Sequence, residues 1–206
     1  MRPAMDRVTI LQAMRLFPAE KEYLQEELCR HLSVPVAFLR PETLDEAGLL
    51  PLAADADVIL GAGFTPAVIE KAKRLRLIQI PHAGVERVDF SCLRGRDILV
   101  CNSHSNADAV AEHGMALLLS LLKKIPVHDR YMRAGDWNRT PGEGVVGQDS
   151  RMLTGSVILF AGYGHIAKKW CRMLQPYGCR FLALSHSGEY CPELSEAGTA
   201  ERLGEL

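Results

Sequence analysis

The 206-residue sequence predicts an α/β protein built on parallel sheets. Two observations lead to this fold class. In the first hundred residues, short apolar runs rich in β-branched side chains alternate with segments of helical periodicity, an order typical of parallel strands joined by helical crossovers. Near residue 160, another apolar run ends in a glycine-rich turn that is followed by a helical pattern. This indicates a second βαβ unit.

In the first half, two helices are expected between five short strands. The first helix has Leu24, Leu28 and Leu32 four residues apart, which predicts one buried stripe. The second begins at Pro66, since proline suits the first turn of a helix. The strands are expected at residues 8–14, 34–39, 56–60, 77–80 and 98–101, and the helices at 19–32 and 66–75.

A long helix is expected from residue 107 to 124, and Pro126 is expected to end it. Its apolar residues are so dense that we expect the helix to be buried between domains or in a subunit interface. The polar, glycine-rich stretch at 135–150 shows no regular pattern.

The composition narrows the function classes. Hydrophobic residues make up 48% and charged residues 24%, with a formal net charge of −1, as in an ordinary globular protein. Near-neutral charge argues against a nucleic-acid partner, and Lys71, Lys73, Arg74 and Arg76 are interpreted as a solvated face. The most apolar run, residues 109–122, contains Glu112 and His113 and is shorter than the ~20 residues of a membrane span. No signal peptide is recognised, so a cytoplasmic protein without a membrane partner is expected.

The six cysteines are interpreted as small buried side chains in a reducing compartment. They form no C-x-x-C pair and match no zinc spacing, so no metal site is expected. They are Cys29, Cys92, Cys101, Cys171, Cys179 and Cys191.

The turn at residues 162–167 has the pattern G-x-G-x-x-A between a strand at 157–161 and a helix that runs to about residue 174. Gly162 permits the tight bend, Gly164 leaves room for a pyrophosphate, and Ala167 lets the helix pack on the strand. The helix N-terminus offers N–H groups and a positive dipole end to phosphates. With a second strand at 180–184, the segment predicts a dinucleotide site.

Ser185 follows this second strand, where an NAD site would normally carry Asp or Glu for the ribose hydroxyls. Ser185, His186 and Ser187 are able to donate to a 2′-phosphate, which a carboxylate would repel. We therefore favour NADP over NAD. The alternative is a neutral replacement in an enzyme that accepts both cofactors.

Several segments, in the same order along the chain, resemble the D-isomer-specific 2-hydroxyacid dehydrogenases, which include phosphoglycerate dehydrogenase and glyoxylate/hydroxypyruvate reductase. The likeness spans residues 75–134 and 153–184. The matching segments are Leu77-Ile-Gln-Ile-Pro-His-Ala-Gly-Val85, Ile98-Leu-Val-Cys-Asn102, Val110-Ala-Glu-His113, Met115-Ala-Leu-Leu-Leu119, Gly135-Asp-Trp137 and Gly162-Tyr-Gly-His-Ile166.

This resemblance implies two domains. Residues 1–102 would form a flavodoxin-like substrate domain without its C-terminal return helix. Residues 103–206 would form an incomplete Rossmann domain that binds NAD(P). The implied activity is that of an oxidoreductase acting on small D-2-hydroxy or 2-keto acids. A homodimer through the helix region 109–122 is also expected.

The resemblance also implies roles for particular residues. Backbone N–H groups around His82, Ala83 and Gly84 would hold the substrate carboxylate; His82 itself is either a hydrogen-bonding group for the substrate or a plain loop histidine. Val110 would lie against the nicotinamide, unless it is a core residue. The residues expected at the rest of the cofactor are Gly162, Gly164, His165, Ile166 and Ser185.

No catalytic residue is expected within these 206 residues. In the family, an arginine, a histidine and a glutamate perform the chemistry, and all three come later in the chain. Glu112 and His113 are neighbours on a helix, where adjacent side chains do not face each other, so we interpret them as structural. The segment 193–206 looks like the helix before the third strand of the cofactor domain. A truncated chain, inactive alone, is therefore expected.

Two other functions remain open at this stage. The first is a non-catalytic dinucleotide-binding sensor or corepressor-like module, because such proteins exist on the same fold. The second is a structural subunit that dimerises through the helix at 109–122.

Overall fold

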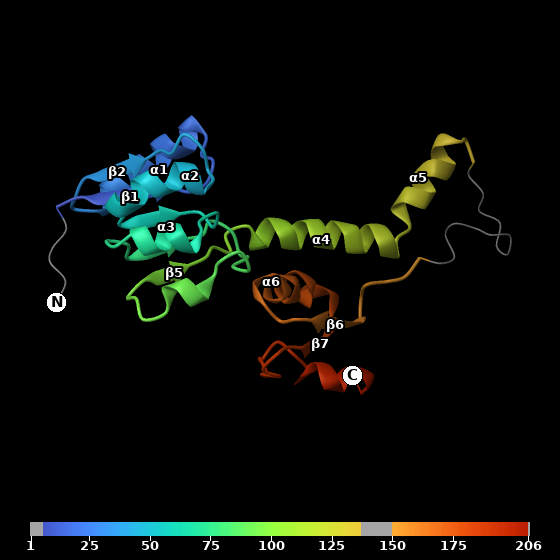
Figure 1. The fold of residues 1–206 in the computed structure, drawn as a ribbon. Helices are drawn as coiled ribbons and strands as arrows, with labels where there is room; N and C mark the ends of the chain where they lie inside the picture. Colours follow the sequence, from blue (N-terminus) through green and yellow to red (C-terminus); the bar gives the residue numbers. More distant parts are fainter. Residues whose placement is uncertain (1–5, 137–149, 206) are drawn as a thin grey trace. The chain divides into compact units, whose positions relative to one another are not determined.

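The computed structural model describes residues 6–136 and 150–205. The chain divides into two compact units, Met1–His104 and Ser105–Leu206, which Figure 1 shows in sequence colours. Of the Gly135-Asp-Trp137 segment, Gly135 and Asp136 are described, whereas Trp137 and the polar stretch up to residue 149 lie outside the described residues.

The first unit contains a five-stranded sheet in the order β2-β1-β3-β4-β5, and every neighbouring pair is parallel. This is the strand order of flavodoxin-like folds, so the predicted fold class is confirmed. The strands are β1 (Val8–Gln12), β2 (Val36–Leu39), β3 (Val58–Leu60), β4 (Leu77–Gln79) and β5 (Leu99–Cys101). The helical segments are α1 (Pro18–His31), α2 (Glu46–Leu49), η1 (Leu50–Asp55), α3 (Pro66–Lys71) and η2 (Phe90–Leu93).

The core of this unit lies over the middle strands. Three fully buried side chains lie side by side, in register, on the neighbouring strands β1, β3 and β4: Leu11, Ile59 and Ile78. Each fully buried aliphatic side chain contributes about 1.5–3 kcal/mol relative to an exposed one. The buried stripe predicted for α1 is wrong: none of its residues is buried, because α1 packs against β2 at the edge of the sheet.

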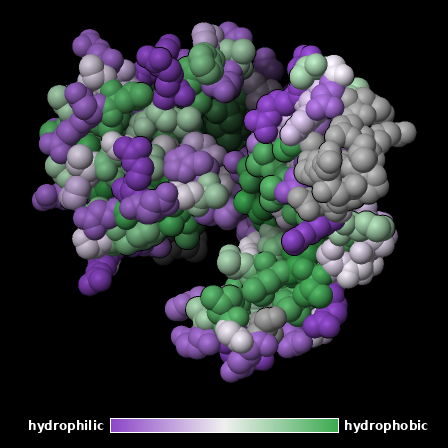
Figure 2. Space-filling model, turned by 90° about the vertical axis from the view of Figure 1, so that its right-hand side faces the viewer, coloured by the Kyte–Doolittle hydropathy of each residue, from purple (hydrophilic) through white to green (hydrophobic). Residues whose placement is uncertain are grey.

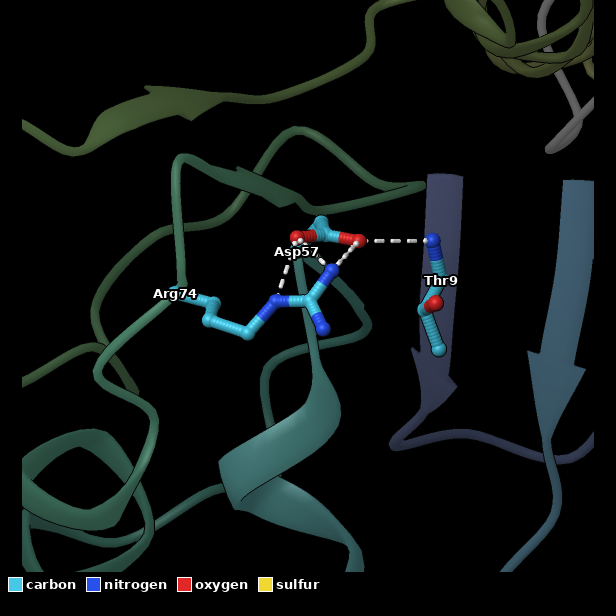
Figure 3. Close-up of polar contacts among 3 residues, drawn as sticks. All are labelled: Thr9, Asp57 and Arg74. Carbon is cyan, nitrogen blue, oxygen red and sulfur yellow. Dashed lines mark hydrogen bonds and ion pairs between the residues drawn. The ribbon is translucent and has the colours of Figure 1, made fainter. Parts of the chain in front are cut away.

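Asp57, directly before β3, joins the amino ends of the strands (Figure 3). Its carboxylate accepts a hydrogen bond from the backbone N–H of Thr9 at 2.9 Å and binds the guanidinium of Arg74. Arg74 is exposed, as the interpretation of a solvated face predicts, and its cationic end pairs in addition with the buried carboxylate of Asp57.

The second unit contains a three-stranded parallel sheet in the order β6-β7-β8. These are β6 (Val157–Ala161), β7 (Arg180–Leu184) and β8 (Glu196–Gly198). The helical segments are α4 (Ala107–Leu122), α5 (Ile125–Arg133), α6 (His165–Leu174), η3 (Gln175–Tyr177) and η4 (Ala200–Gly204). The order matches the first three strands of a dinucleotide-binding sheet.

Two expectations for this unit are corrected. The segment at 193–206 contains the third strand itself, because the N–H of Ser195 donates to Phe181 O and that of Ser185 to Gly198 O, which aligns β8 beside β7. Pro126 does more than end a helix. It lies in the first turn of α5, where its missing N–H costs nothing, and Lys124 at φ 53° separates α5 from α4.

The burial expected for α4, between domains or in a subunit interface, stays a prediction, and within the single chain most of the helix is uncovered. Only Ala107, Ala111 and Met115, spaced four apart, are buried, whereas Leu117 and Leu121 are 59% and 67% exposed. Figure 2 shows hydrophobic surface in the lower part of the view. Because that view is turned about the vertical axis of Figure 1, this surface is at the height of α6, β6 and β7. The second unit therefore carries more apolar surface than a solvated face requires.

The cysteines do not share one environment. Cys29 and Cys101 are exposed, which contradicts the expected burial, and Cys171 is buried; Cys92, Cys179 and Cys191 are half-buried. In the described ranges, no group of His, Cys, Asp and Glu is arranged to hold a metal ion. No helix in the described part of the chain is long and apolar enough to cross a membrane.

Candidate functional site

The glycine turn after β6 leaves open space at the N-terminus of α6. Gly162 has φ 102°, a conformation that side-chain-bearing residues rarely adopt. A Cβ atom built on Gly162 or Gly164 would meet nothing within 4 Å. Gly164 precedes the helix in an extended conformation, and no side chain caps the first turn. This open, uncapped helix end is the kind of space that a pyrophosphate fills.

Two contacts hold the turn against its neighbours. The N–H of Gly162 donates to the carbonyl oxygen of Leu184 at 2.7 Å, which joins the turn to the end of β7. Ala167, on the first turn of α6, is 8% exposed and lets the helix lie close to the sheet. The turn therefore has the features that G-x-G-x-x-A predicts: a bend, an open second glycine and a small packing residue.

Tyr163 is the residue of this turn that the sequence did not single out. Its hydroxyl donates to Cys171 Sγ at 3.5 Å, and its ring centroid lies 6.0 Å from that of Phe160. Burial, followed by the hydrogen bond to Cys171, raises the pKa of Tyr163. The tyrosine thus points into the core while the two glycines leave the outer side open.

Ser185 lies at the carboxyl end of β7, directly after the carbonyl that binds Gly162. Its Oγ accepts a hydrogen bond from the N–H of Gly188 at 3.0 Å, and Ser187 Oγ accepts from Glu189 N–H at 3.3 Å. These bonds use only the oxygen of each hydroxyl as an acceptor. The hydroxyl proton of each serine is therefore left to donate to another acceptor. His186 between them is exposed.

The fold brings most of the expected cofactor residues to one edge of the second unit. Gly162, Gly164, His165 and Ile166 lie on the turn and the first turn of α6, and Ser185 lies beside it. Val110 projects from α4 and is 41% exposed. Asp108, two residues before Val110 on a different face of α4, binds Lys169 of α6 at 2.6 Å, so α4 and α6 are joined near this edge.

The expected substrate loop belongs to the first unit and follows β4. The carbonyl oxygen of Ala83 accepts from Asn102 Nδ2 at 2.8 Å, and that of His82 accepts from Ser103 N–H at 3.2 Å. These bonds turn the carbonyls toward the segment after β5. The N–H groups of Ala83 and Gly84 form no hydrogen bond with any described residue.

Glu86 was missed by the sequence reasoning. Its carboxylate oxygens lie 2.6 Å from where a Cβ atom of Gly84 would be, so a side chain at position 84 would displace Glu86. No sequence pattern predicts this contact, because it depends on the conformation of the loop. His82 is exposed, and nothing in the loop pairs it with an acid.

Comparisons with known proteins agree with this architecture. Residues 8–204 match the model of the catalytic domain of D-isomer specific 2-hydroxyacid dehydrogenases. The chain is 30% identical over 162 residues to formate dehydrogenase of Pichia angusta, 34% over 109 residues to D-3-phosphoglycerate dehydrogenase of Archaeoglobus fulgidus, and 28% over 131 residues to a glyoxylate/hydroxypyruvate reductase of Arabidopsis thaliana. These matches cover 74%, 52% and 62% of this chain, but only 43%, 20% and 39% of the relatives.

Solved structures show the same fold. The PH0520 protein of Pyrococcus horikoshii superposes with a TM-score of 0.68 at 25% identity, over 94% of this chain and 55% of that one. A family protein from Aeromonas salmonicida superposes with a TM-score of 0.65 at 19% identity, over 98% of this chain and 60% of that one. The family match over nearly the whole sequence, together with these two sheets, shows that this chain belongs to the D-isomer specific 2-hydroxyacid dehydrogenase family.

Proposed function

We propose that this chain binds NAD(P) at the glycine turn and belongs to an oxidoreductase of small D-2-hydroxy or 2-keto acids. The observation that carries the proposal is the open, uncapped N-terminus of α6, with Gly162 and Gly164 before it and Ser185 beside it. A bound nicotinamide dinucleotide supplies or accepts a hydride in such reactions. The residues named here bind and orient the partners of that transfer.

Different residues would bind each part of the nucleotide. The pyrophosphate would lie on the backbone of Gly162, Gly164, His165 and Ile166, where the helix dipole favours an anion. The adenosine ribose would lie beside Ser185, and the nicotinamide near Val110. The substrate carboxylate would accept from the N–H groups of Ala83 and Gly84, which form no bond with the described residues.

NADP is the cofactor that this geometry favours. Ser185 and Ser187 each keep a hydroxyl proton to donate, and no carboxylate occupies position 185 to repel a 2′-phosphate. The structure of an acyclic imino acid reductase solved with NADPH shares the fold at a TM-score of 0.65 and 19% identity. This shared fold is compatible with either cofactor, and the two serines give the preference.

A polypeptide of these 206 residues is expected to bind nucleotide without turning over substrate. The carbonyl that accepts a hydride needs a proton donor and a cation to stabilise its oxygen. The resemblance assigns the arginine, histidine and glutamate of that chemistry to no residue of this chain. Glyoxylate or hydroxypyruvate reduction by the purified chain at ordinary enzyme rates would disprove this expectation.

Nucleotide binding is tested by titration with NADPH and NADH, followed through nucleotide fluorescence. Saturable binding, tighter for NADPH, is expected. Gly164→Ala should abolish it without unfolding the chain, since the added methyl meets no protein atom within 4 Å but enters the space of the pyrophosphate. Gly204→Ala is the matched control, because its Cβ also meets nothing within 4 Å and it lies outside the turn. Equal binding by both variants would refute the site.

We further propose a homodimer through the α4 region, Ala109–Leu122. Leu117 and Leu121 lie one turn apart and are both exposed, whereas Leu118 packs against the core of the second unit. Leu121→Glu should therefore reduce the mass measured by light scattering to that of a monomer and spare nucleotide binding. Leu203→Glu, at a residue 61% exposed on η4, is the control. An unchanged mass for Leu121→Glu would rule out this interface.

A further inference from the structure

We propose that Tyr163 is a positioning residue for the nucleotide: its side chain holds the glycine turn in its binding conformation through Cys171 and Phe160. This inference rests on the proposed nucleotide site. Tyr163 would touch no part of the ligand and would act only through the backbone on either side of it.

The turn needs such an anchor because both of its glycines are conformationally permissive. Gly162 and Gly164 flank Tyr163, and a Cβ atom on either would meet no atom within 4 Å, so no packing of their own restrains them. Glycine loses more backbone freedom on ordering than any other residue. A turn that is disordered before binding pays that entropy when the ligand arrives, which weakens affinity. Tyr163 is the one side chain between the glycines that is able to remove this cost beforehand.

The contacts of Tyr163 suit this role. The hydroxyl donates to Cys171 Sγ at 3.5 Å, and Cys171 is 2% exposed within α6. The ring lies against Phe160, which is 9% exposed at the end of β6. Lys168 Nζ lies 5.9 Å from the ring centroid. The side chain is therefore tied both to the strand that enters the turn and to the helix that leaves it.

The hydroxyl also keeps its proton. Burial raises the pKa of Tyr163 above its usual range, with the hydrogen bond to Cys171 as the next cause. The phenol is thus a permanent donor at ordinary pH, and the link to Cys171 does not depend on the conditions of a binding experiment. Together with the bond from Gly162 N–H to Leu184 O, it fixes the turn from two sides.

The test compares Tyr163→Phe, Cys171→Ala and the double variant for binding of NADPH and of adenosine 2′-monophosphate, which has no pyrophosphate. Each single variant should weaken NADPH binding about two- to tenfold, the effect of one neutral hydrogen bond. The double variant should be no weaker than the singles, since both remove the same bond. Binding of adenosine 2′-monophosphate should not change. Tyr177→Phe, at a partly exposed tyrosine on η3, is the matched control.

A second measurement needs no ligand. Amide hydrogen exchange at Gly162, whose N–H is bonded to Leu184 O, should be faster in Tyr163→Phe than in the parent, while exchange along β7 stays the same. Unchanged exchange at Gly162 with unchanged NADPH affinity would overturn the inference, as would an equal loss of affinity for both nucleotides. If the parent chain binds neither nucleotide, the proposed function itself fails, and the inference is refuted with it.

Discussion

The guanidinium of Arg74 binds the carboxylate of Asp57 through two nitrogen atoms, with Nε and Nη2 at 3.1 and 2.9 Å from Oδ1. The side chain of Asp57 is 5% exposed and that of Arg74 is 50% exposed. The same carboxylate accepts the N–H of Thr9, and the carbonyl of Asp57 accepts the N–H of Arg76. One residue thereby joins β1, β3 and β4 at the edge opposite the candidate substrate loop.

Removing either partner of this pair should destabilise the first unit. Arg74→Gln leaves a buried carboxylate with only its backbone donor, and we expect a loss of about 2 kcal/mol in the free energy of unfolding, less than for a fully buried pair because Arg74 reaches solvent. Urea unfolding, followed by circular dichroism, measures this loss in the free energy of unfolding. Asp129→Asn, in an exposed pair with Arg133, is the control and should change the free energy by less than about 1 kcal/mol. Equal effects for the two would mean that the Asp57 pair is no stronger than a surface contact.

The contact between α4 and α6 depends on a glycine. A Cβ atom on Gly114 would lie 2.7 Å from Cζ2 of Trp170, whose Nε1 donates to Ala111 O at 3.0 Å. Although alanine favours helix formation by about 1 kcal/mol over glycine, an overpacked core costs about 1–3 kcal/mol, so Gly114→Ala should destabilise the second unit.

The matched test places Gly114→Ala in a Trp170→Phe background, where the smaller ring makes room for the methyl group. Thermal unfolding of the four proteins gives the coupling between the two positions. We expect Gly114→Ala to be destabilising beside tryptophan and neutral or stabilising beside phenylalanine. The same effect in both backgrounds would show that Trp170 is not what requires glycine.

Ser185 decides the cofactor in our proposal, so its replacement should change the preference. Ser185→Asp removes a donor and adds a negative charge beside the 2′-position of the ribose. We expect NADPH binding to fall at least about tenfold, which corresponds to 1.4 kcal/mol, while NADH binding stays equal or improves. Fluorescence titration with both nucleotides measures the ratio, and Ser187→Asp shows whether the neighbouring hydroxyl matters as much. If the ratio of NADPH to NADH affinity did not change, the 2′-phosphate would not bind beside Ser185.

Alkaline pH should destabilise the second unit more than the first, because burial raises the pKa of two groups there and of Cys92 alone among the described residues of the first unit. Burial raises the pKa of Cys171, and burial also raises that of Tyr163, so both groups keep their protons to higher pH in the folded chain than in the unfolded chain. The unfolded chain releases these protons first, from about pH 8.5 for cysteine and about 10 for tyrosine. Stability from these groups is therefore complete below the unfolded pKa values and is lost as pH rises through them.

Urea unfolding between pH 7 and 10.5, followed through tryptophan fluorescence, measures this slope, because both tryptophans lie in the second half of the sequence. Cys171→Ala should flatten the slope above about pH 8.5. Cys29→Ala, at an exposed thiol, should leave it unchanged. If the parent and Cys171→Ala lose stability in parallel, the buried thiol does not cause the alkaline loss.

Local signals in the sequence predicted the conformation of the second unit's glycine turn well. The pattern from β6 through Gly162, Gly164 and Ala167 to β7 matches the structure with the predicted strand bounds, because bend, open glycine and small packing residue are all properties of neighbouring residues. Five parallel strands in the first unit were also predicted, within a few residues, since buried parallel strands have continuous apolar runs. The strand β8 was missed because its sequence, Glu196-Ala-Gly198, carries no such run.

The sequence by itself thus determined the fold class, the alternation of strands and helices and the conformation of the glycine turn, all of which are encoded in short segments. Only the tertiary structure decided which faces are covered: α4 is apolar nearly all round, yet only three of its residues are buried. It also decided that Arg74 pairs with Asp57, and that Glu86 lies over Gly84 and Tyr163 reaches Cys171. These contacts depend on where the backbone brings residues together in space, and no local periodicity carries that information.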